Sequence, residues 1–328
     1  MAPSIDCGSA CLNCELPIRL DTYKGCQHGC TYCFNRRFRD ISQIIPRKCV
    51  GELKSFISGN RNVYTRWCDW NIPLHWGGNS DPFQPCEEQY GISYKCLEVF
   101  AETKYPFVVS TKGKLLATPK YLEVLKQCDC VVQISMTSPL FDKWEQGAPT
   151  FAEKLKMIEK IRPNCRRVIV RMQPYIREAK KDVLSELQIL KDLGVHSVVL
   201  EGMRFRKKAK GLEKRGGSYC YPIDMLEYDF GKIREKAWSV GLKFYSGEPD
   251  LRSMGDDLCC CGVGDIYKTN KVTEERYYQG LELPFTDKMK EKGTALCWRA
   301  MRMNTAWGEM CKKSSYEEMF YKMIAERG

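Results

Sequence analysis

The sequence has no long apolar run, no repeat and no biased tract. No window approaches about 18 consecutive apolar residues, and the first residues, MAPSIDCGSACLNCEL, lack a basic stretch followed by an apolar one. Neither a solenoid-length repeat nor a low-complexity segment occurs. These absences argue against a membrane helix, an export signal and a solenoid. We therefore expect a cytoplasmic protein that has no membrane partner.

The composition is that of a folded protein with two anomalies. Apolar residues make up 43% and charged residues 28% of the 328 residues, which excludes a disordered or collagen-like chain. The net charge of +11 favours a polyanionic partner, although it is also a common level for solubility. Nineteen cysteines are unusually many, and the lack of an export signal argues against a disulfide framework. Metal or iron–sulfur ligation is the leading interpretation.

Short β-branched runs alternate with longer amphipathic stretches, which is typical of repeated βα units on a mostly parallel sheet. We expect strands at 18–23, 72–77, 106–111, 130–136, 167–173, 197–201 and 242–245. We expect helices at 87–103, 119–127, 150–161, 181–193 and 223–240. Six such alternations fit a partial barrel, a full barrel or an open sheet.

The regular pattern divides the chain into a core and two additions. We predict a Cys-rich N-terminal extension at 1–16, a core domain at 17–246 and a Cys-containing C-terminal extension at 247–328. Within the core, residues 204–215 hold seven basic residues and one acid, and we expect a loop there.

Three cysteines lie on one short segment after the first expected strand. The segment TYKGCQHGCTYCFNRR places Cys26, Cys30 and Cys33 at CxxxCxxC spacing. Three thiolates on one loop suit three irons of a cubane [4Fe–4S] cluster, which normally takes four cysteine ligands. The open iron can then chelate the amino and carboxylate groups of a methionine-like ligand. Zinc binding and chance are the alternatives, because the same spacing also occurs once upstream.

The motif resembles that of radical SAM enzymes, CxxxCxΦC, in which Φ is aromatic and is here Tyr32. More narrowly, GCQHGCTYCF resembles the branch that contains spore photoproduct lyase and its DNA-repair-like relatives, over about residues 18–202. The resemblance implies an α/β fold, a partial (β/α)6 TIM-like barrel with its active site at the strand carboxyl ends. It also implies a [4Fe–4S] cluster on Cys26, Cys30 and Cys33 and reductive cleavage of S-adenosylmethionine (SAM).

Later segments match the same branch. GGNSDPFQPCE resembles its TDPYQPxE segment, and EQGAPTFAEKL resembles ExxAPxxxxRL, with Lys154 where the family has arginine. The resemblance assigns SAM binding to Tyr32, Gly77, Gly78, Asn79, Asp81, Lys112, Ser135 and Glu145. It puts Tyr32 and Arg171 at catalytic positions. Taken singly, the aspartate and serine among these residues are also good helix caps.

Two departures argue against spore photoproduct lyase activity itself. HWGGNSD has no cysteine where that enzyme has its hydrogen donor, and Phe34 follows the last motif cysteine where a tyrosine is frequent. We therefore predict a related radical enzyme with a different outcome. The resemblance implies a nucleobase in DNA or RNA as substrate and a flavodoxin- or ferredoxin-type electron donor.

The basic segment fits such a substrate. Phosphate contacts supply sequence-independent affinity for nucleic acids. We predict them at Arg204, Arg206, Lys207, Lys208 and Lys210. A solvated connection without a ligand is the alternative.

The remaining cysteines leave a second metal centre open. We predict an iron–sulfur or zinc site at Cys7, Cys11, Cys14 and Cys261, because four thiolates suit either. Buried thiols are the alternative, and we expect them at Cys49, Cys96, Cys128, Cys130 and Cys165. Two other functions therefore stay open. One is a radical SAM peptide-modifying enzyme with an auxiliary cluster, and the other is a zinc-dependent nucleic-acid-binding module.

Overall fold

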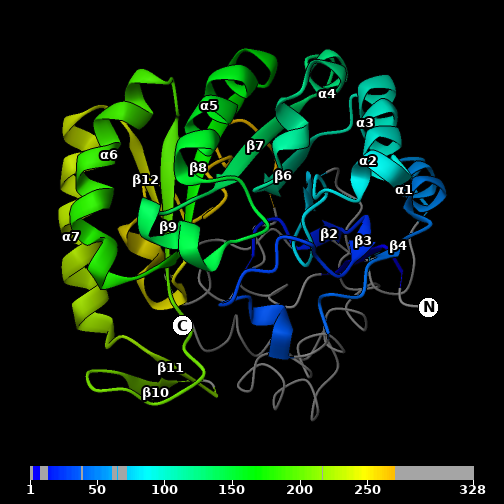
Figure 1. Ribbon diagram of the computed structural model, residues 1–328. Helices are drawn as coiled ribbons and strands as arrows, with labels where there is room; N and C mark the ends of the chain where they lie inside the picture. The colour runs from blue at the N-terminus through cyan, green and yellow to red at the C-terminus, as the bar shows by residue number, and fades with distance from the viewer. Residues whose placement is uncertain are drawn as a thin grey trace, which may run out of the picture.

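The computed structural model describes residues 3–7, 14–37, 40–60, 65, 72–215 and 217–269 (Figure 1). Within them, one eight-stranded sheet has the order β1-β2-β5-β6-β7-β8-β9-β12. Strand β1 is antiparallel to β2, and every other neighbouring pair is parallel. The bounds are β1 (Ile5–Cys7), β2 (Ile18–Leu20), β5 (Leu74–Trp76), β6 (Phe107–Thr111), β7 (Cys130–Ser135), β8 (Arg167–Tyr175), β9 (Ser197–Gly202) and β12 (Lys243–Ser246).

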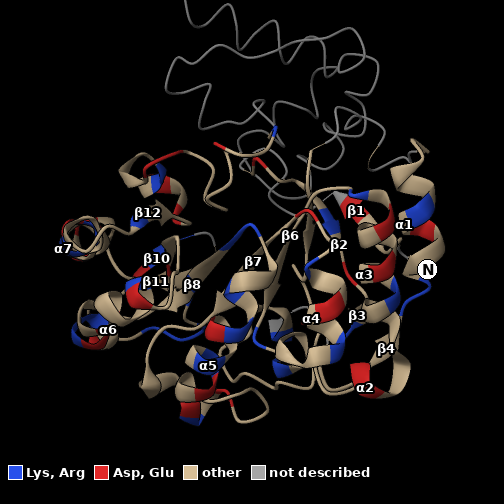
Figure 2. Cartoon of the chain, turned by 90° about the horizontal axis from the view of Figure 1, so that it is seen from above, with Lys and Arg blue, Asp and Glu red and all other residues tan. Residues whose placement is uncertain are grey.

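The helices follow the outer face of the sheet in an arc, as both Figure 1 and Figure 2 show. They are α1 (Cys49–Ile57), α2 (Glu87–Tyr90), α3 (Ile92–Thr103), α4 (Pro119–Leu125), α5 (Phe151–Ile161), α6 (Lys180–Asp192) and α7 (Ile223–Ser239). Two small antiparallel pairs lie outside the main sheet. They are β3 (Tyr23–Lys24) with β4 (Ile45–Pro46), and β10 (Glu213–Arg215) with β11 (Ser218–Cys220).

The expected α/β fold with a mostly parallel sheet is confirmed. Over the described residues the sheet is open, with β1 and β12 at its two edges, so no closed barrel is present there. No helix in the same ranges combines the length and apolar content needed to cross a bilayer. Strand β1, which falls in the segment predicted as an extension, adds an antiparallel edge to the sheet.

Three local expectations need correction. The helix expected at 87–103 is two helices, because Gly91 adopts a left-handed φ of +59° between them. The segment 204–215 is not a loop throughout, since its last three residues pair with β11 as a hairpin. Helix α1 was not expected from the sequence at all.

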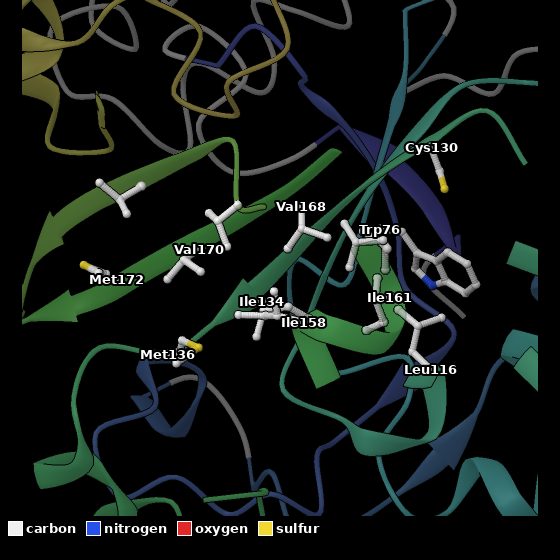
Figure 3. Packing of buried hydrophobic residues seen from close by; sticks show 14 of the residues in the cluster. Trp76, Leu116, Cys130, Ile134, Met136, Ile158, Ile161, Val168, Val170 and Met172 are labelled. Carbon is white, nitrogen blue, oxygen red and sulfur yellow. The ribbon is translucent and has the colours of Figure 1, made fainter. Parts of the chain in front are cut away.

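The two faces of the sheet bury different sets of side chains. Alternate strand residues such as Val132 and Ile134 point outward and pack with the helices, and Figure 3 shows part of this core around Trp76 and Val168. The strand residues between them, such as Val131, point to the opposite, inner face of the sheet. There the cover is the chain around 259–263, not a helix. On the inner face, residues 14–16 and 259–267 therefore bring side chains to the sheet.

Candidate active site

The three motif cysteines lie between β3 and β4, close to the carboxyl end of β2. Cys30 is buried, and Cys26 and Cys33 are half-buried. Gly25 allows the turn into this loop, because its φ is +88° and a Cβ would lie 2.2 Å from the Gln43 carbonyl oxygen. Burial, and then the nearby Asp81 carboxylate, raise the pKa of the Cys26 thiol to about 12. Burial also raises the pKa of Cys30, while the positive charge of Lys112 opposes that rise.

The cysteine loop is held by the segment that follows β5. The Gln27 backbone N–H donates to the Gln84 side chain at 2.7 Å, and the Gln27 side chain accepts from the Cys86 backbone N–H at 2.5 Å. His28 Nε2 lies 3.1 Å from Asp81 Oδ2, and its Nδ1 lies 2.8 Å from the Gly147 carbonyl oxygen. The sequence reasoning missed Gln27 and His28, although both lie inside the TYKGCQHGC motif.

Asp81 joins three loops at the carboxyl edge of the sheet. Besides His28, its carboxylate accepts from the Thr111 hydroxyl at 2.7 Å and from the Lys112 backbone N–H at 2.6 Å. Although burial opposes ionisation, His28 and these donors lower the pKa of Asp81. Asp81, predicted to bind SAM, therefore fixes the backbone from which the Lys112 side chain extends.

Glu145 binds three side chains, of which Tyr32 and Lys112 are predicted site residues. Its two carboxylate oxygens accept from Lys154 Nζ and, at 3.2 Å, from Lys112 Nζ, and Tyr32 donates its hydroxyl to the same carboxylate. Lys112 also donates to the Ser135 carbonyl oxygen at 3.2 Å. Burial would raise the pKa of Glu145, but the charges of Lys112 and Lys154 lower it to about 2. The carboxylate is therefore ionised at neutral pH.

Helix α5 places Lys154 in this group. The helix begins at a capping box in which the Thr150 side chain accepts from the Glu153 backbone N–H and Glu153 accepts in return from Thr150. Lys154, one residue further on, faces inward and is 2% exposed. The family position usually held by arginine is thus a buried ion-pair partner of Glu145.

The glycines expected beside the cofactor have structural reasons of their own. Gly77 has a φ of +88°, and a Cβ there would lie 2.5 Å from the Ser110 carbonyl oxygen. A Cβ on Gly78 would lie 2.8 Å from Cδ of Arg19. Asn79 donates to the Asp21 carboxylate from its backbone at 2.9 Å and from its side chain at 2.6 Å. Their contact with a cofactor stays a prediction.

Arg171 lies away from the Glu145 group, on the inner face of β8. It donates to the Gln173 side chain, and its Nη2 lies 3.6 Å from Glu201 Oε2. It pairs in register with Ser135 of β7, so both belong to the same row near the strand carboxyl ends. Arg171 also interacts with the thiol of Cys260. Its predicted place at the mouth of the sheet is consistent with this register.

The predicted nucleic-acid contacts divide into two groups. Arg206, Lys207, Lys208 and Lys210 are exposed, and Arg206 Nη2 donates to the Cys33 carbonyl oxygen at 3.2 Å. Arg204 is half-buried and bonds to Glu248 at 2.6 Å and to the Cys220 sulfur at 3.0 Å. Arg206 therefore contacts the cysteine loop, whereas Arg204 is engaged in an internal ion pair.

Two of the four cysteines predicted for a second metal centre are described. Cys14 packs against the inner-face cluster that contains Cys261. Cys11 and the side chain of Cys7 lie outside the described residues, as do Cys68, Cys297 and Cys311. The N-terminal segment and the chain beyond β12 therefore meet on the sheet, and the Thr269 hydroxyl donates to Glu15 at 2.6 Å.

The donor set of the loop fits an iron–sulfur cluster. Three thiols lie on one loop, and the Lys112 ammonium near Cys30 favours thiolate at that residue. Over the described ranges, no three histidine, cysteine, aspartate or glutamate side chains converge on one point as ligands of a single ion would. A cubane takes each thiolate on a different iron, so its ligands are spread more widely than those of one ion.

Comparisons by sequence find relatives without an assigned activity. No protein-family model matches the chain. Uncharacterized proteins of Mycobacterium tuberculosis and Mycobacterium bovis are each 25% identical to it over 210 residues. The match covers 60% of this chain and 62% of each relative, so it spans less than two thirds of their length.

Comparison of structures defines the class of fold. The chain has a helix-covered, mostly parallel sheet of the kind found in spore photoproduct lyase complexed with dinucleoside spore photoproduct, with a TM-score of 0.55 at 15% identity. The match covers 70% of this chain and 76% of that one. A mutant of the same lyase with bound AdoMet and dinucleoside spore photoproduct gives a TM-score of 0.54. The resemblance predicted from the motifs is confirmed in the fold: the chain folds like spore photoproduct lyase.

Proposed function

We propose that this chain is a cytoplasmic radical SAM enzyme, with a [4Fe–4S] cluster on Cys26, Cys30 and Cys33. The observation that carries the proposal is the cysteine loop at the carboxyl edge of a parallel sheet, bound through Asp81 to the backbone of Lys112. When bound, the cluster and SAM supply a 5′-deoxyadenosyl radical, which abstracts hydrogen from an unactivated carbon. We further propose that the open sheet is curved and forms a partial barrel.

The roles of the protein side chains follow from the ion-pair group. Lys112 is 12% exposed, so its ammonium can reach a ligand carboxylate while Glu145 holds it in place. Tyr32 is fixed by the same carboxylate and by an edge contact with Phe141, at a centroid distance of 5.6 Å. We assign Lys112 to the SAM methionine end and Tyr32, with the Ser135 region, to its adenosine end. Rigid placement matters because small displacements of reacting groups reduce rates strongly.

A nucleobase in DNA or RNA is the proposed substrate. The similar lyase was solved with a dinucleoside photoproduct, and in this chain Arg206 bonds to the loop that carries Cys33. Exposed lysines at 207, 208 and 210 continue from that contact, so a phosphate backbone bound there would lie beside the cluster loop. A flavodoxin- or ferredoxin-type protein is the proposed electron donor.

Replacing Cys30 tests the proposal. Under anaerobic conditions with a chemical reductant, we expect the wild type to form 5′-deoxyadenosine from SAM and Cys30→Ala to form none. Cys128→Ala is the matched control, because Cys128 is a half-buried thiol outside the loop. Circular dichroism establishes whether each variant keeps its fold. Retained 5′-deoxyadenosine formation in folded Cys30→Ala contradicts the assignment of the loop.

A further inference from the structure

A second group of cysteines lies on the inner face of the sheet. Cys259, Cys260 and Cys261 are buried there against the inward residues of the strands. Gln133 Nε2 of β7 donates to the Cys261 carbonyl oxygen at 3.2 Å, and Arg167 Nη1 of β8 donates to the Gly262 carbonyl oxygen at 3.0 Å. These hydrogen bonds attach the segment to the sheet through its backbone, so they do not use its thiols.

The thiols form one group with Cys14. The Cys261 thiol interacts with those of Cys259 and Cys260, and the Cys14 thiol interacts with that of Cys260. Cys14 is separated from the other three by more than 240 positions in the sequence, so the fold alone brings them together. Four thiols from two distant segments are the ligand number that structural zinc sites and iron–sulfur clusters use.

Two arginines face the same thiols. Arg171 and Arg252 each interact with Cys14, Cys260 and Cys261. Arg252 is 7% exposed, and its Nε finds no hydrogen-bond acceptor among the described residues; Nη1 of Arg171 is equally without one. Buried N–H donors without an acceptor are rare and indicate a missing partner. The Glu201 carboxylate is paired with Arg171 and also lies near Arg252.

We propose that Cys14, Cys259, Cys260 and Cys261 bind a second metal centre and that Arg171 and Arg252 balance the charge of its thiolates. Four thiolates carry more negative charge than a divalent ion or a cubane core cancels, which buried cations offset. Sulfur ligands also accept the free guanidinium N–H groups, a contact that tunes iron–sulfur centres. The four thiols do not converge on one point in the described chain, so binding requires their side chains to turn.

Metal analysis of the full chain, produced and purified without oxygen, tests this site. We measure iron, zinc and acid-labile sulfide per chain in the wild type, Cys30→Ala and Cys260→Ser. Cys260→Ser should lose the metal of the inner-face site and keep that of the cysteine loop. Cys30→Ala should lose the metal of the cysteine loop and keep that of the inner-face site. Iron lost together with sulfide identifies an iron–sulfur cluster, and loss of about one zinc identifies a zinc site. Wild-type metal and sulfide content in Cys260→Ser overturns the proposal.

The design separates this proposal from the proposed function. If the loop binds no cluster, Cys30→Ala has the same metal content as the wild type, and Cys260→Ser still loses its set. If the inner face binds none, Cys30→Ala is free of metal. Cys165→Ser is the matched control, because Cys165 is a half-buried thiol on the outer side of the sheet. It should keep the full metal content.

Arg252→Gln keeps all four thiols, so it tests the same site even if Cys260→Ser does not fold. Removing one buried cation should weaken metal retention, by about 10-fold or more as for other residues that surround a metal site. The readout is the rate at which a chelator removes the metal that Cys30→Ala retains, compared with Cys30→Ala in which Arg252 is intact. Equal rates contradict the role of Arg252 at the site.

Discussion

Glu145 is bound by two lysines, one on each carboxylate oxygen. Lys154 contacts Oε2 and Lys112 lies 3.2 Å from Oε1. An arginine at position 154, which the family pattern favours, would present two parallel donors to one carboxylate and compete for Oε1. The lysine makes a single-point contact and leaves Oε1 to Lys112. The departure from the family pattern is therefore compatible with the same ion-pair group.

Glu145→Gln tests how much the group contributes to stability. The pKa of Glu145 is lowered from 4.5 to about 2 in the folded chain, so its contribution is complete above pH 4.5 and is lost as the pH falls toward 2. This difference corresponds to about 3 kcal/mol. We expect the variant to be less stable than the wild type at pH 7 and the gap to close between pH 4.5 and 2. Urea unfolding at each pH measures it.

Glu159→Gln is the control for this comparison. Glu159 is exposed on the same helix, α5, and should leave the pH profile as it is in the wild type. If the difference in unfolding free energy between Glu145→Gln and the wild type stays constant down to the lowest pH, the two lysines do not lower the pKa of Glu145.

The sequence motifs predicted which residues belong to the site, but they did not predict the contacts that those residues make. Lys112 and Glu145 were found by spacing and resemblance, and the structure brings them together. The contact of His28 with Asp81 was not foreseen, because the two residues are 53 positions apart and meet only once the loops at the sheet edge are in place. Arg204 was grouped with its exposed neighbours because a charge run does not reveal a buried partner such as Glu248.

Strands were predictable and interruptions were not. The β-branched runs at β6, β7 and β9 are buried on both faces, so their apolar pattern is nearly continuous and easily found. The break at Gly91 was missed because helical periodicity continues across it. Helix α1 follows Lys48, which makes no side-chain cap, whereas the shorter helix α4 has the proline at its first position that marks a helix start.

Gly262 controls whether the cysteine segment can lie on the sheet. Its φ is +64°, and a Cβ there would lie 2.8 Å from the Tyr245 ring and 2.9 Å from Cδ1 of Ile169. Gly262→Ala adds the left-handed backbone cost of about 1–2 kcal/mol and a clash with two packed side chains. We expect a lower midpoint in urea and faster proteolysis near 259–269.

Gly211→Ala separates the two causes. Gly211 has a φ of +80° but no heavy atom within 4 Å of the position a Cβ would take, so its variant carries the backbone cost alone. Gly262→Ala should be the more destabilised of the two. Equal losses would mean that the segment does not pack closely on Tyr245 and Ile169.

At the scale of the whole molecule, charge is mixed over the helices and concentrated beside the cysteine loop. Figure 2 shows basic and acidic positions interspersed along the outer helices. Residues 204–210 instead carry five basic residues and no acid. The net charge of +11 indicated a polyanion, but only the fold shows that this segment reaches Cys33. The proximity of Cys14 and Cys260 likewise depends on the fold, because both segments pack on the inner face of the sheet.

The salt dependence of nucleic-acid binding tests that concentration of charge. If Lys207, Lys208 and Lys210 contact phosphates, each should contribute about 0.7 to 0.9 to the slope of log affinity against log salt. Replacing all three by glutamine should therefore weaken binding and flatten the slope by about 2 to 3. Fluorescence anisotropy with labelled single- and double-stranded DNA over a range of salt concentrations measures both.

A charge-matched variant distinguishes the loop from the net charge. Replacing the exposed lysines at 156, 160 and 181 on α5 and α6 by glutamine also removes three positive charges, but from the outer helices. Long-range attraction depends on total charge and falls equally in both variants, whereas released counterions are lost only where phosphates were contacted. The outer-helix variant should thus keep the wild-type slope. Equal slopes in all three proteins would remove the segment from the binding surface, and a wild-type slope near zero would remove nucleic acid as the substrate class.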